Sequence, residues 1–434
     1  MLPNTLFHSM LAATATPDPP IALIIPFVAL LLCIACGPLT FAKLWEPHYP
    51  KFAVAFGLIP VGYYLLVFSA GERLLHVLWE YLSFVIFIGS LFVAAGGVVV
   101  RTKGGATPLR NTVFLAVGAV LANVIGTTGA SMLLIRPWMR MNKYRFTSLH
   151  AAFFIFAVSN IGGCLTPIGD PPLLLGYLKG VPFFWTLRCL PAWGVALSLV
   201  LLVFYFVDRR NFLRAPAEVR DAGTANDEFR IDGARNFLLI AVMLGAIIWA
   251  PPGWREAALL LAAFVSYKTT PRDVHAANNF SFHPVHEIAW LFAGIFATMV
   301  PALDYLSHHA ADLGVEKPAG FYWLTGILSS VLDNAPTYLA ALATALGRNG
   351  LSIDNPAHVA AFAAEYPQHL LAISLAAVFF GAGTYIGNGP NFLVKAICQH
   401  AGVRTPGFFE YILRFALPVL VPIFALVAWL FFSR

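Results

Sequence analysis

The sequence predicts an all-α, polytopic membrane protein built from two inverted repeats. Of its 434 residues, 59% are hydrophobic and only 11% are charged, which is too little charge for a water-soluble domain of this length. Apolar runs long enough to cross about 30 Å of hydrocarbon recur along the chain. A motif rich in Gly and Pro also occurs twice, each time inside an apolar stretch. We expect about ten transmembrane crossings, two re-entrant helical hairpins and two broken helices.

The repeated motif lies where an apolar helix is interrupted. Gly163-x-x-Thr166-x-Ile168-Gly169-Asp170-x-Pro172 returns 218 residues later as Gly381-x-x-Thr384-x-Ile386-Gly387-Asn388-x-Pro390. A proline inside a helix removes a backbone hydrogen bond and costs about 3 kcal/mol. Hydrocarbon offers no water to the freed groups, so such a break is tolerated only where it lines a protein-enclosed cavity. Two breaks at membrane depth, one with an aspartate, are typical of a transporter's binding site.

The first repeat is expected over residues 21–207. Its apolar runs start at about Ile21, Phe52 and Leu74. Two short apolar pieces between about Asn111 and Trp138 flank a small polar tip, which favours a re-entrant hairpin over one long span. A broken helix over about 148–179 and a span over about 184–207 complete the repeat. Residues 1–20 are expected to form a short non-cytoplasmic segment; they lack the positively charged start of a signal peptide.

The second repeat, residues 237–434, follows a polar linker at 208–236 and has the same order. Spans start near Phe237, Ala257 and Glu287. A hairpin is expected over about 320–346, a broken helix over about 370–399 and a last span over 408–432. Because a hairpin does not cross, each half crosses an odd number of times. The second half is therefore inverted relative to the first.

The basic residues support this topology. With the linker in the cytoplasm, nineteen Lys and Arg residues fall inside and seven fall outside. If either hairpin were counted as a crossing helix, the basic loops would no longer lie on the same side of the membrane. The pattern favours a cytoplasmic linker with both termini outside. It also assigns the net charge of +6 to membrane-protein loops, so no nucleic-acid partner is expected.

Polar residues gather at the two hairpin tips and the two breaks. Unwound backbone and Ser, Thr, Asn and Asp side chains offer the oxygen ligands that sodium accepts, whereas half-helix N-termini can hold an anion. The candidates for ion or substrate binding are Asn123, Thr127, Thr128, Ser159, Asn160, Thr166, Asp170, Asp333, Asn334, Thr337, Thr384, Asn388 and Asn391. The candidate sodium ligands among them are Asp170, Asp333, Asn160, Thr166, Thr384 and Asn388.

The two aspartates distinguish a cation site from an anion site. A charged Asp at mid-membrane costs roughly 2.5–3.5 kcal/mol, so Asp170 and Asp333 are suited to hold either a proton or a metal cation. Two carboxylates without a nearby arginine make a poor site for a dicarboxylate. The alternative is that each Asp merely caps a half-helix. Lys395, two turns beyond Asn388, is expected either to pair with a site aspartate or to extend to the cytoplasmic interface.

Three segments carry a resemblance to the ion transporter superfamily: Ser159-Asn160-Ile161-Gly162-Gly163, Thr166-Pro167-Ile168-Gly169-Asp170 and Asp333-Asn334-Ala335-Pro336. The nearest branches are the D-type sodium/proton antiporters and related citrate-transporter-like membrane proteins. The resemblance covers nearly the whole chain. It implies an inverted-repeat fold, often dimeric, with a mobile transport domain and with cation sites at the hairpin tips and breaks. The dicarboxylate branch carries Ser-Asn-Thr at its tips, where this chain has Gly126-Thr127-Thr128 and Asp333-Asn334-Ala335.

We therefore expect a secondary active transporter of the bacterial inner membrane that exchanges sodium for protons. The alternative is cation-coupled transport of citrate or another carboxylate. A remote alternative is an intramembrane enzyme, but an aspartyl protease needs Gly-x-Gly-Asp where this chain has Pro167-Ile168-Gly169-Asp170, and no His-Glu-x-x-His occurs. No cofactor is expected, with Na⁺ and H⁺ as transported ions. The expected partners are membrane lipid, small ions or a carboxylate, and, by resemblance, a second copy in a homodimer.

The topology is testable by cysteine labelling. In a cysteine-free background, single cysteines placed in the 208–236 linker and at Lys317 should react with a membrane-impermeant reagent from opposite sides, because three predicted crossings lie between these two positions. Labelling in sealed right-side-out and inside-out vesicles provides the measurement. Reaction of both cysteines from the same side would contradict the inverted topology.

Overall fold

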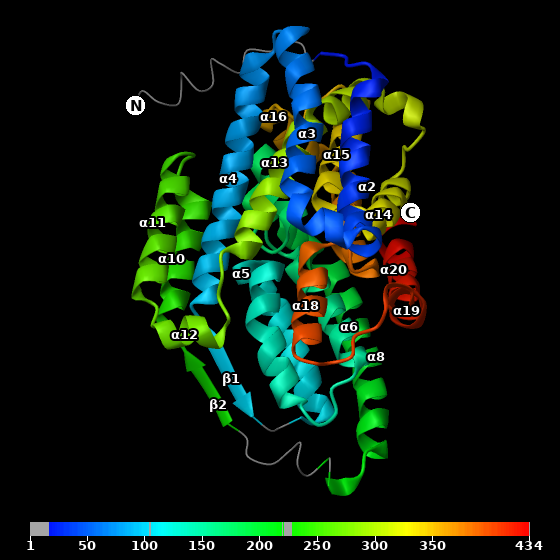
Figure 1. The fold of residues 1–434 in the computed structure, drawn as a ribbon. Coiled ribbons are helices and arrows are strands. Elements are labelled where there is room, and N and C mark those ends of the chain that lie inside the picture. Colours follow the sequence, from blue (N-terminus) through cyan, green and yellow to red (C-terminus); the bar gives the residue numbers. More distant parts are fainter. Residues whose placement is uncertain (1–16, 104–105, 219, 221–227, 434) are drawn as a thin grey trace.

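The computed structural model describes residues 17–103, 106–218, 220 and 228–433 (Figure 1). Residues 1–16 of the expected N-terminal segment, and residues 219 and 221–227 of the linker, lie outside the described part. The described chain consists almost entirely of helices, with one short two-stranded sheet. The predicted fold class, a helical polytopic membrane protein with interrupted helices, is confirmed.

The helices of the first half follow the predicted order. Their bounds are η1 (Ile21–Ile24), α2 (Ile25–Thr40), α3 (Ala42–Leu66), α4 (Gly71–Gly96), α5 (Pro108–Met141), α6 (Ser148–Ala157), η2 (Ile161–Cys164), α7 (Pro171–Lys179), η3 (Phe183–Cys189) and α8 (Leu190–Arg214). Here η marks a short 3₁₀ helix. The apolar run expected from Phe52 is the second part of α3, which begins earlier and contains three prolines.

The second half has the same order with additions. Its bounds are α10 (Arg235–Trp249), α11 (Trp254–Thr269), α12 (Arg272–Ala277), α13 (His283–His308), η4 (Ala310–Leu313), α14 (Pro318–Val331), α15 (Asn334–Arg348), α16 (Pro356–Glu365), α17 (Pro367–Phe380), η5 (Gly381–Gly383), α18 (Gly389–His400), α19 (Phe408–Tyr411), a π-helical turn, η6 (Ile412–Ala416), and α20 (Leu417–Phe432). The short helices α12 and α16 were not predicted. Helix α16 meets α17 at a bend of 101°.

Seven helices in the described chain are long and apolar enough to cross a membrane, by length and composition. Six of them are predicted crossings, and the seventh is α5, the first predicted hairpin. The remaining expected crossings are the short helices α10 and α11 and the two broken helices. The number is lower than ten because α10 and α11 have only 15 and 16 residues and the other two crossings are interrupted at their breaks.

Both re-entrant hairpins are present. Helix α5 turns back at Gly126, whose φ of 78° is in the left-handed region that a side chain disfavours. In the second half, Leu332 and Asp333 separate α14 from α15. Figure 1 shows α5 in the lower half of the view, and α14 and α15 in the upper half. The hairpins thus enter from opposite ends and bring their tips toward the middle of the molecule.

The sheet joins the two halves at the lower end of the view (Figure 1). Strand β1 (Val99–Lys103) follows α4, and strand β2 (Glu228–Asp232) lies in the linker before α10. The strands are antiparallel, with Val99 opposite Asp232. The polarity of residues 208–236 predicts only a linker, so strand β2 was not predicted. The pairing fastens the start of the second half to the end of α4.

Buried ion pairs connect helices near the opposite end. Asp304 of α13 pairs with Arg73 of α4, and Arg73 also donates to Asp354 at 2.7 Å. Lys179, at the end of α7, lies 2.9 Å from both Asp354 and Glu80. The side chains of Lys179 and Asp304 are only 5% and 2% exposed. Because buried charges are tolerated when they are paired, this network holds α4, α13, α7 and the α15–α16 connection together.

The network is testable at Asp354, which serves both cations. Asp354→Asn should cost roughly 1.5–3 kcal/mol, because it removes the buried carboxylate that Arg73 and Lys179 share and leaves each cation with one carboxylate partner, Asp304 or Glu80. The measurement is the midpoint of thermal unfolding in detergent. Glu410→Gln is the matched control, since it breaks the exposed Arg414 pair and should cost less than about 0.5 kcal/mol. An unchanged midpoint for Asp354→Asn would contradict the role of the network.

The same comparison has a pH dependence. Burial alone would raise the pKa of Asp354, but Lys179 and Arg73 outweigh it and hold that pKa well below its usual range. A carboxyl group with a lowered folded-state pKa stabilises the fold above its ordinary pKa of about 3.9 and loses this contribution as the pH falls toward the folded value. The difference in midpoint between the wild type and Asp354→Asn should therefore shrink in that acidic range.

Candidate functional site

The two helix breaks have closely similar geometry. The residues that precede α7 and α18 are Asp170, with φ −146° and ψ 146°, and Asn388, with φ −154° and ψ 138°. Each break is also tied to its own hairpin by a threonine. The hydroxyl of Thr166 donates to the carbonyl oxygen of Asn123, and that of Thr384 donates to the carbonyl oxygen of Ser330, both at 2.6 Å. The repeated sequence motif thus corresponds to a repeated local structure.

The glycines of the motif allow the chain to cross itself within each break. A Cβ atom on Gly163 would lie 2.6 Å from the carbonyl oxygen of Gly169, and one on Gly387 would lie 2.7 Å from that of Gly381. Both contacts are with backbone, which cannot move aside cheaply. The shared Gly spacing therefore reflects a close approach of backbone segments that a side chain would prevent.

The carboxyl group of Asp170 lies where the breaks and hairpins meet, and the residue is 1% exposed. Its Oδ1 accepts hydrogen bonds from the Thr127 hydroxyl at 2.6 Å and from Asn388 Nδ2 at 3.0 Å. Its Oδ2 accepts a hydrogen bond from Asn334 Nδ2 at 2.6 Å. The three donors belong to the first hairpin, the second break and the second hairpin. Asp170 is thus a point at which side chains from both halves of the chain meet.

The structure separates the two aspartates. The Asp170 side chain makes no capping hydrogen bond to its own helix, α7. Asp333 does cap its helix, because its Oδ1 accepts a hydrogen bond from the Ala335 amide at 3.0 Å. The capping alternative considered for both residues therefore fits Asp333 and does not fit Asp170.

Asparagines extend the cluster around Asp170. Asn388 Nδ2 also donates to Asn160 Oδ1 at 3.1 Å and to the Ser159 carbonyl oxygen at 3.3 Å. Asn160 Nδ2 donates to Asn391 Oδ1 at 2.7 Å. Asn391 in turn donates to the carbonyl oxygen of Thr384 at 2.9 Å. These amides satisfy the backbone groups that the breaks leave free, as a low-dielectric site requires.

The other predicted residues lie near the cluster with local partners. Asn123 donates to the Gly162 carbonyl oxygen at 2.6 Å, and Thr337 donates to that of Asp333 at 2.8 Å. Together with Thr166 and Thr384, they hold tips and breaks in place, and in the described part of the chain none of the four donates a hydrogen bond to Asp170. Among the described residues, no hydrogen bond links Thr128 to the cluster.

Two serines that the candidate set omitted take part. The hydroxyl of Ser131 lies 2.7 Å from that of Ser159. The backbone carbonyl oxygen of Ser330 accepts the hydrogen bond from the Thr384 hydroxyl. Both serines lie on the hairpins close to their tips. The sequence motif compares only the two breaks. A comparison of the first hairpin with the second could have pointed to these two serines. Lys395, whose role was open, places its ammonium group 4.5 Å from the centre of the Tyr385 ring.

One oxygen in the cluster has no hydrogen-bond partner among the residues that the structure describes. Asn334 Oδ1 is buried and unpaired, although the same amide group donates to Asp170. In addition, α7, α15, α18 and the second arm of α5 all begin at this cluster. Their N-terminal dipoles favour negative charge at Asp170. The site therefore combines a stabilised carboxylate with a free oxygen ligand.

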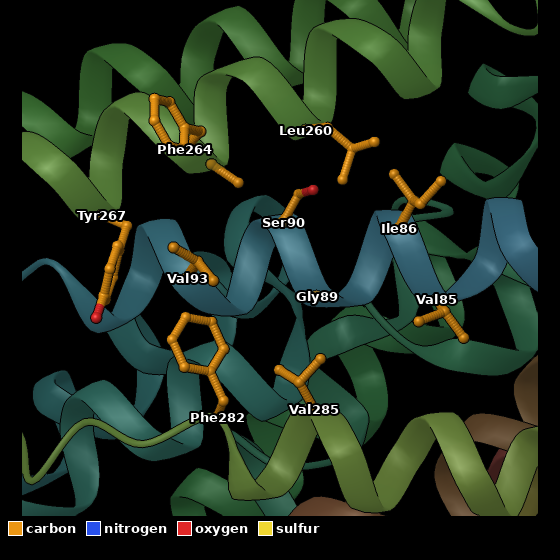
Figure 2. A pocket seen from close by; sticks show the side chains of 11 residues that line it. Val85, Ile86, Gly89, Ser90, Val93, Leu260, Phe264, Tyr267, Phe282 and Val285 are labelled. Atoms are coloured by element: carbon orange, nitrogen blue, oxygen red, sulfur yellow. The ribbon is translucent and has the colours of Figure 1, made fainter.

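A separate cavity of about 350 Å³ lies among α4, α11 and the start of α13 (Figure 2). Figure 2 shows Leu260 and Phe264 on one side, Phe282 and Val285 on the other, and Ser90 between them. Its lining is almost wholly apolar. Since no charged side chain lines it, this cavity lacks the groups that would recognise an ion or a carboxylate.

Comparison with known families gives one match, over residues 16–432, to a protein-family model described as "Putative citrate transport". The chain belongs to this citrate-transporter family. The assignment makes it an integral membrane protein and a transporter, in agreement with the resemblance found in its motifs. No curated protein matched the chain.

The crossing of the break segments in this family member is testable with two glycine variants. Gly163→Ala should lower the midpoint of thermal unfolding, with a cost of about 1–3 kcal/mol, because the added methyl group meets the Gly169 backbone. Gly389→Ala is the control from the other break, where a Cβ would meet nothing within 4 Å. Scanning fluorimetry in detergent compares the two. Equal midpoints would show that the break segments are not closely packed.

Proposed function

We propose that the protein is a secondary active transporter that exchanges sodium for protons at Asp170. The proposal rests on one observation: a buried carboxyl group that accepts hydrogen bonds from three donors lies beside Asn334, whose own amide oxygen has no hydrogen-bond partner among the described residues. The six predicted sodium ligands then have different roles. Asp170 is the exchanging group, Asn160 and Asn388 surround it, and Thr166, Thr384 and Asp333 support the breaks and the tip.

The ionised form of Asp170 suits a sodium ion. Three donors and four converging helix N-termini support the negative charge without neutralising it. A bound cation would be held by the carboxylate, by Asn334 Oδ1 and by nearby amide and carbonyl oxygens. Hard cations prefer such oxygen ligands. The residues present therefore fit sodium as the transported ion.

The protonated form of Asp170 suits the same surroundings. A neutral carboxyl group needs an acceptor for its O–H, and the amide of Asn334 can supply its oxygen by turning over. Proton and sodium then compete for one group, so that binding of one requires release of the other. Competition of this kind is the requirement for exchange.

Charge at the cluster argues for a cation. The helix N-termini that could attract an anion already face the carboxylate of Asp170. In the described part of the chain, no Lys or Arg side chain forms an ion pair with Asp170, and Lys395 lies over Tyr385 instead. A carboxylate bound here would be placed beside Asp170 and would pay the cost of like-charge repulsion.

The family match supports a second candidate, cation-coupled transport of citrate or another carboxylate. Asp170 would then bind the coupling cation, and the anion would bind elsewhere. Both candidates share the other elements of the proposal: a bacterial inner-membrane location, a cytoplasmic linker and a homodimeric assembly. They differ in whether proton and sodium fluxes require a carboxylate.

The proposal predicts the behaviour of two conservative variants in proteoliposomes. Asp170→Asn keeps shape and hydrogen bonding but removes the titrating charge, so sodium-driven proton flux should fall at least about 100-fold. Asp333→Asn should retain most of the flux, because Asn is as good an N-cap as Asp. Flux is measured as a pH change on addition of sodium, with and without citrate, over a range of pH.

Each outcome bears on one candidate. Wild-type-like exchange in Asp170→Asn would leave sodium/proton antiport without support. Flux that occurs only with citrate, and is still lost in Asp170→Asn, would establish the second candidate. Lithium and potassium in place of sodium define the cation.

A further inference from the structure

A basic cavity of about 850 Å³ lies among the end of α5, the α12 region and the end of α18. Its cations are Arg136, Arg140 and Lys143, with His400 opposite. Arg136 and Arg140 are four positions apart and share one face near the end of α5, and Lys143 lies in the turn that follows this helix. The positive-inside pattern places this cavity on the cytoplasmic side.

These cations lack acidic partners. In the described part of the chain, no ion pair joins Arg136, Arg140 or Lys143 to a carboxylate, whereas the neighbouring Arg145 is paired with Asp208. The Nη1 atom of Arg136 is buried and has no hydrogen-bond partner. A buried guanidinium N–H without an acceptor is costly, so the cavity is built to receive an anion.

The rest of the lining is apolar. Met139 and Phe146 lie beside the cations, and Ile397 and Val403 line the cavity from α18 and the segment after it. A small hydrophilic anion needs the cations and gains little from this apolar surface. A phospholipid has an anionic phosphate and hydrocarbon chains in one molecule, and basic pockets between helices on the cytoplasmic side suit such head groups. We propose that this cavity binds the phosphate head group of an anionic phospholipid.

The cavity is distinct from the Asp170 cluster yet connected to it. The second arm of α5 runs from Thr127, which donates to Asp170, to Arg136, which lines the cavity. At 1.5 Å per residue, this separation is about 14 Å. Helix α18 runs similarly from Asn388 at the cluster to His400 at the cavity. A head group bound to both helix ends would stabilise the arrangement of their other ends around Asp170, whichever ion is transported.

The test uses the purified full-length protein in detergent. The midpoint of thermal unfolding is measured during titration with cardiolipin, with phosphatidylcholine of the same acyl chains as the neutral lipid. Inorganic phosphate and citrate are the soluble-anion arms. The variants are Arg140→Gln/Lys143→Gln, both at exposed positions, and separately Arg136→Gln. Lys268→Gln is the control, because it removes an exposed charge from the same side outside the cavity.

Cardiolipin should raise the wild-type midpoint in a saturable manner. The apparent affinity should fall at least about tenfold in Arg140→Gln/Lys143→Gln, since each cation near the surface contributes about 1 kcal/mol. The affinity of Lys268→Gln should be unchanged. Equal cardiolipin effects in the double variant and the wild type, or an equal effect of phosphatidylcholine, would overturn the proposal. Stabilisation by phosphate or citrate that displaces cardiolipin would show a soluble-anion site and overturn the lipid assignment.

Discussion

The carboxyl group of Asp170 is held between the two halves of the chain, and its burial constrains the parts of the structure around it. A carboxylate at this depth requires hydrogen-bond donors, and they come from the first hairpin, the second hairpin and the second break. Those donors can converge only if both helices are interrupted at the same depth. The interruptions in turn require glycines where the backbone crosses and amides that satisfy the freed carbonyl groups.

The duplicated motif explains why the two breaks have similar geometry. The positions at which the two copies differ explain why one carboxyl group and one amide meet at the site. Asp170 and Asn388 occupy equivalent motif positions and lie 3.0 Å apart. Two carboxylates at this distance would repel one another and share a proton, whereas an amide donates to its carboxylate partner. Asn160 and Asn391 form a second contact across the halves, yet the positions 218 residues away hold Val378 and Leu173. The polar groups that join the halves are therefore not copies of one another.

Patterns of Gly, Pro and apolar residues predicted the hairpins and breaks because these features depend on local backbone chemistry. The same patterns led to the prediction of Asp170, Asn160, Asn388, Thr127 and Asn334 as site residues, and hydrogen bonds connect these five side chains in the structure. They could not show that Thr166 and Thr384 turn toward hairpin carbonyl oxygens, since side-chain direction depends on packing. Sequence patterns also could not predict contacts between distant positions. The Arg73–Asp354 pair joins residues 281 positions apart, and the cavity at Arg136 is formed by three separate segments.

The central claim is that a proton and a sodium ion share one site at Asp170. The most direct test is proton release by the purified protein in weakly buffered detergent solution when sodium is added. Since a cation that binds a protonated ligand must displace its proton, the account predicts proton release on sodium binding that rises toward one proton per sodium as the pH is lowered and Asp170 becomes protonated. Choline should cause no release. Saturable sodium binding without any proton release, at every pH at which the protein is folded, would contradict the claim.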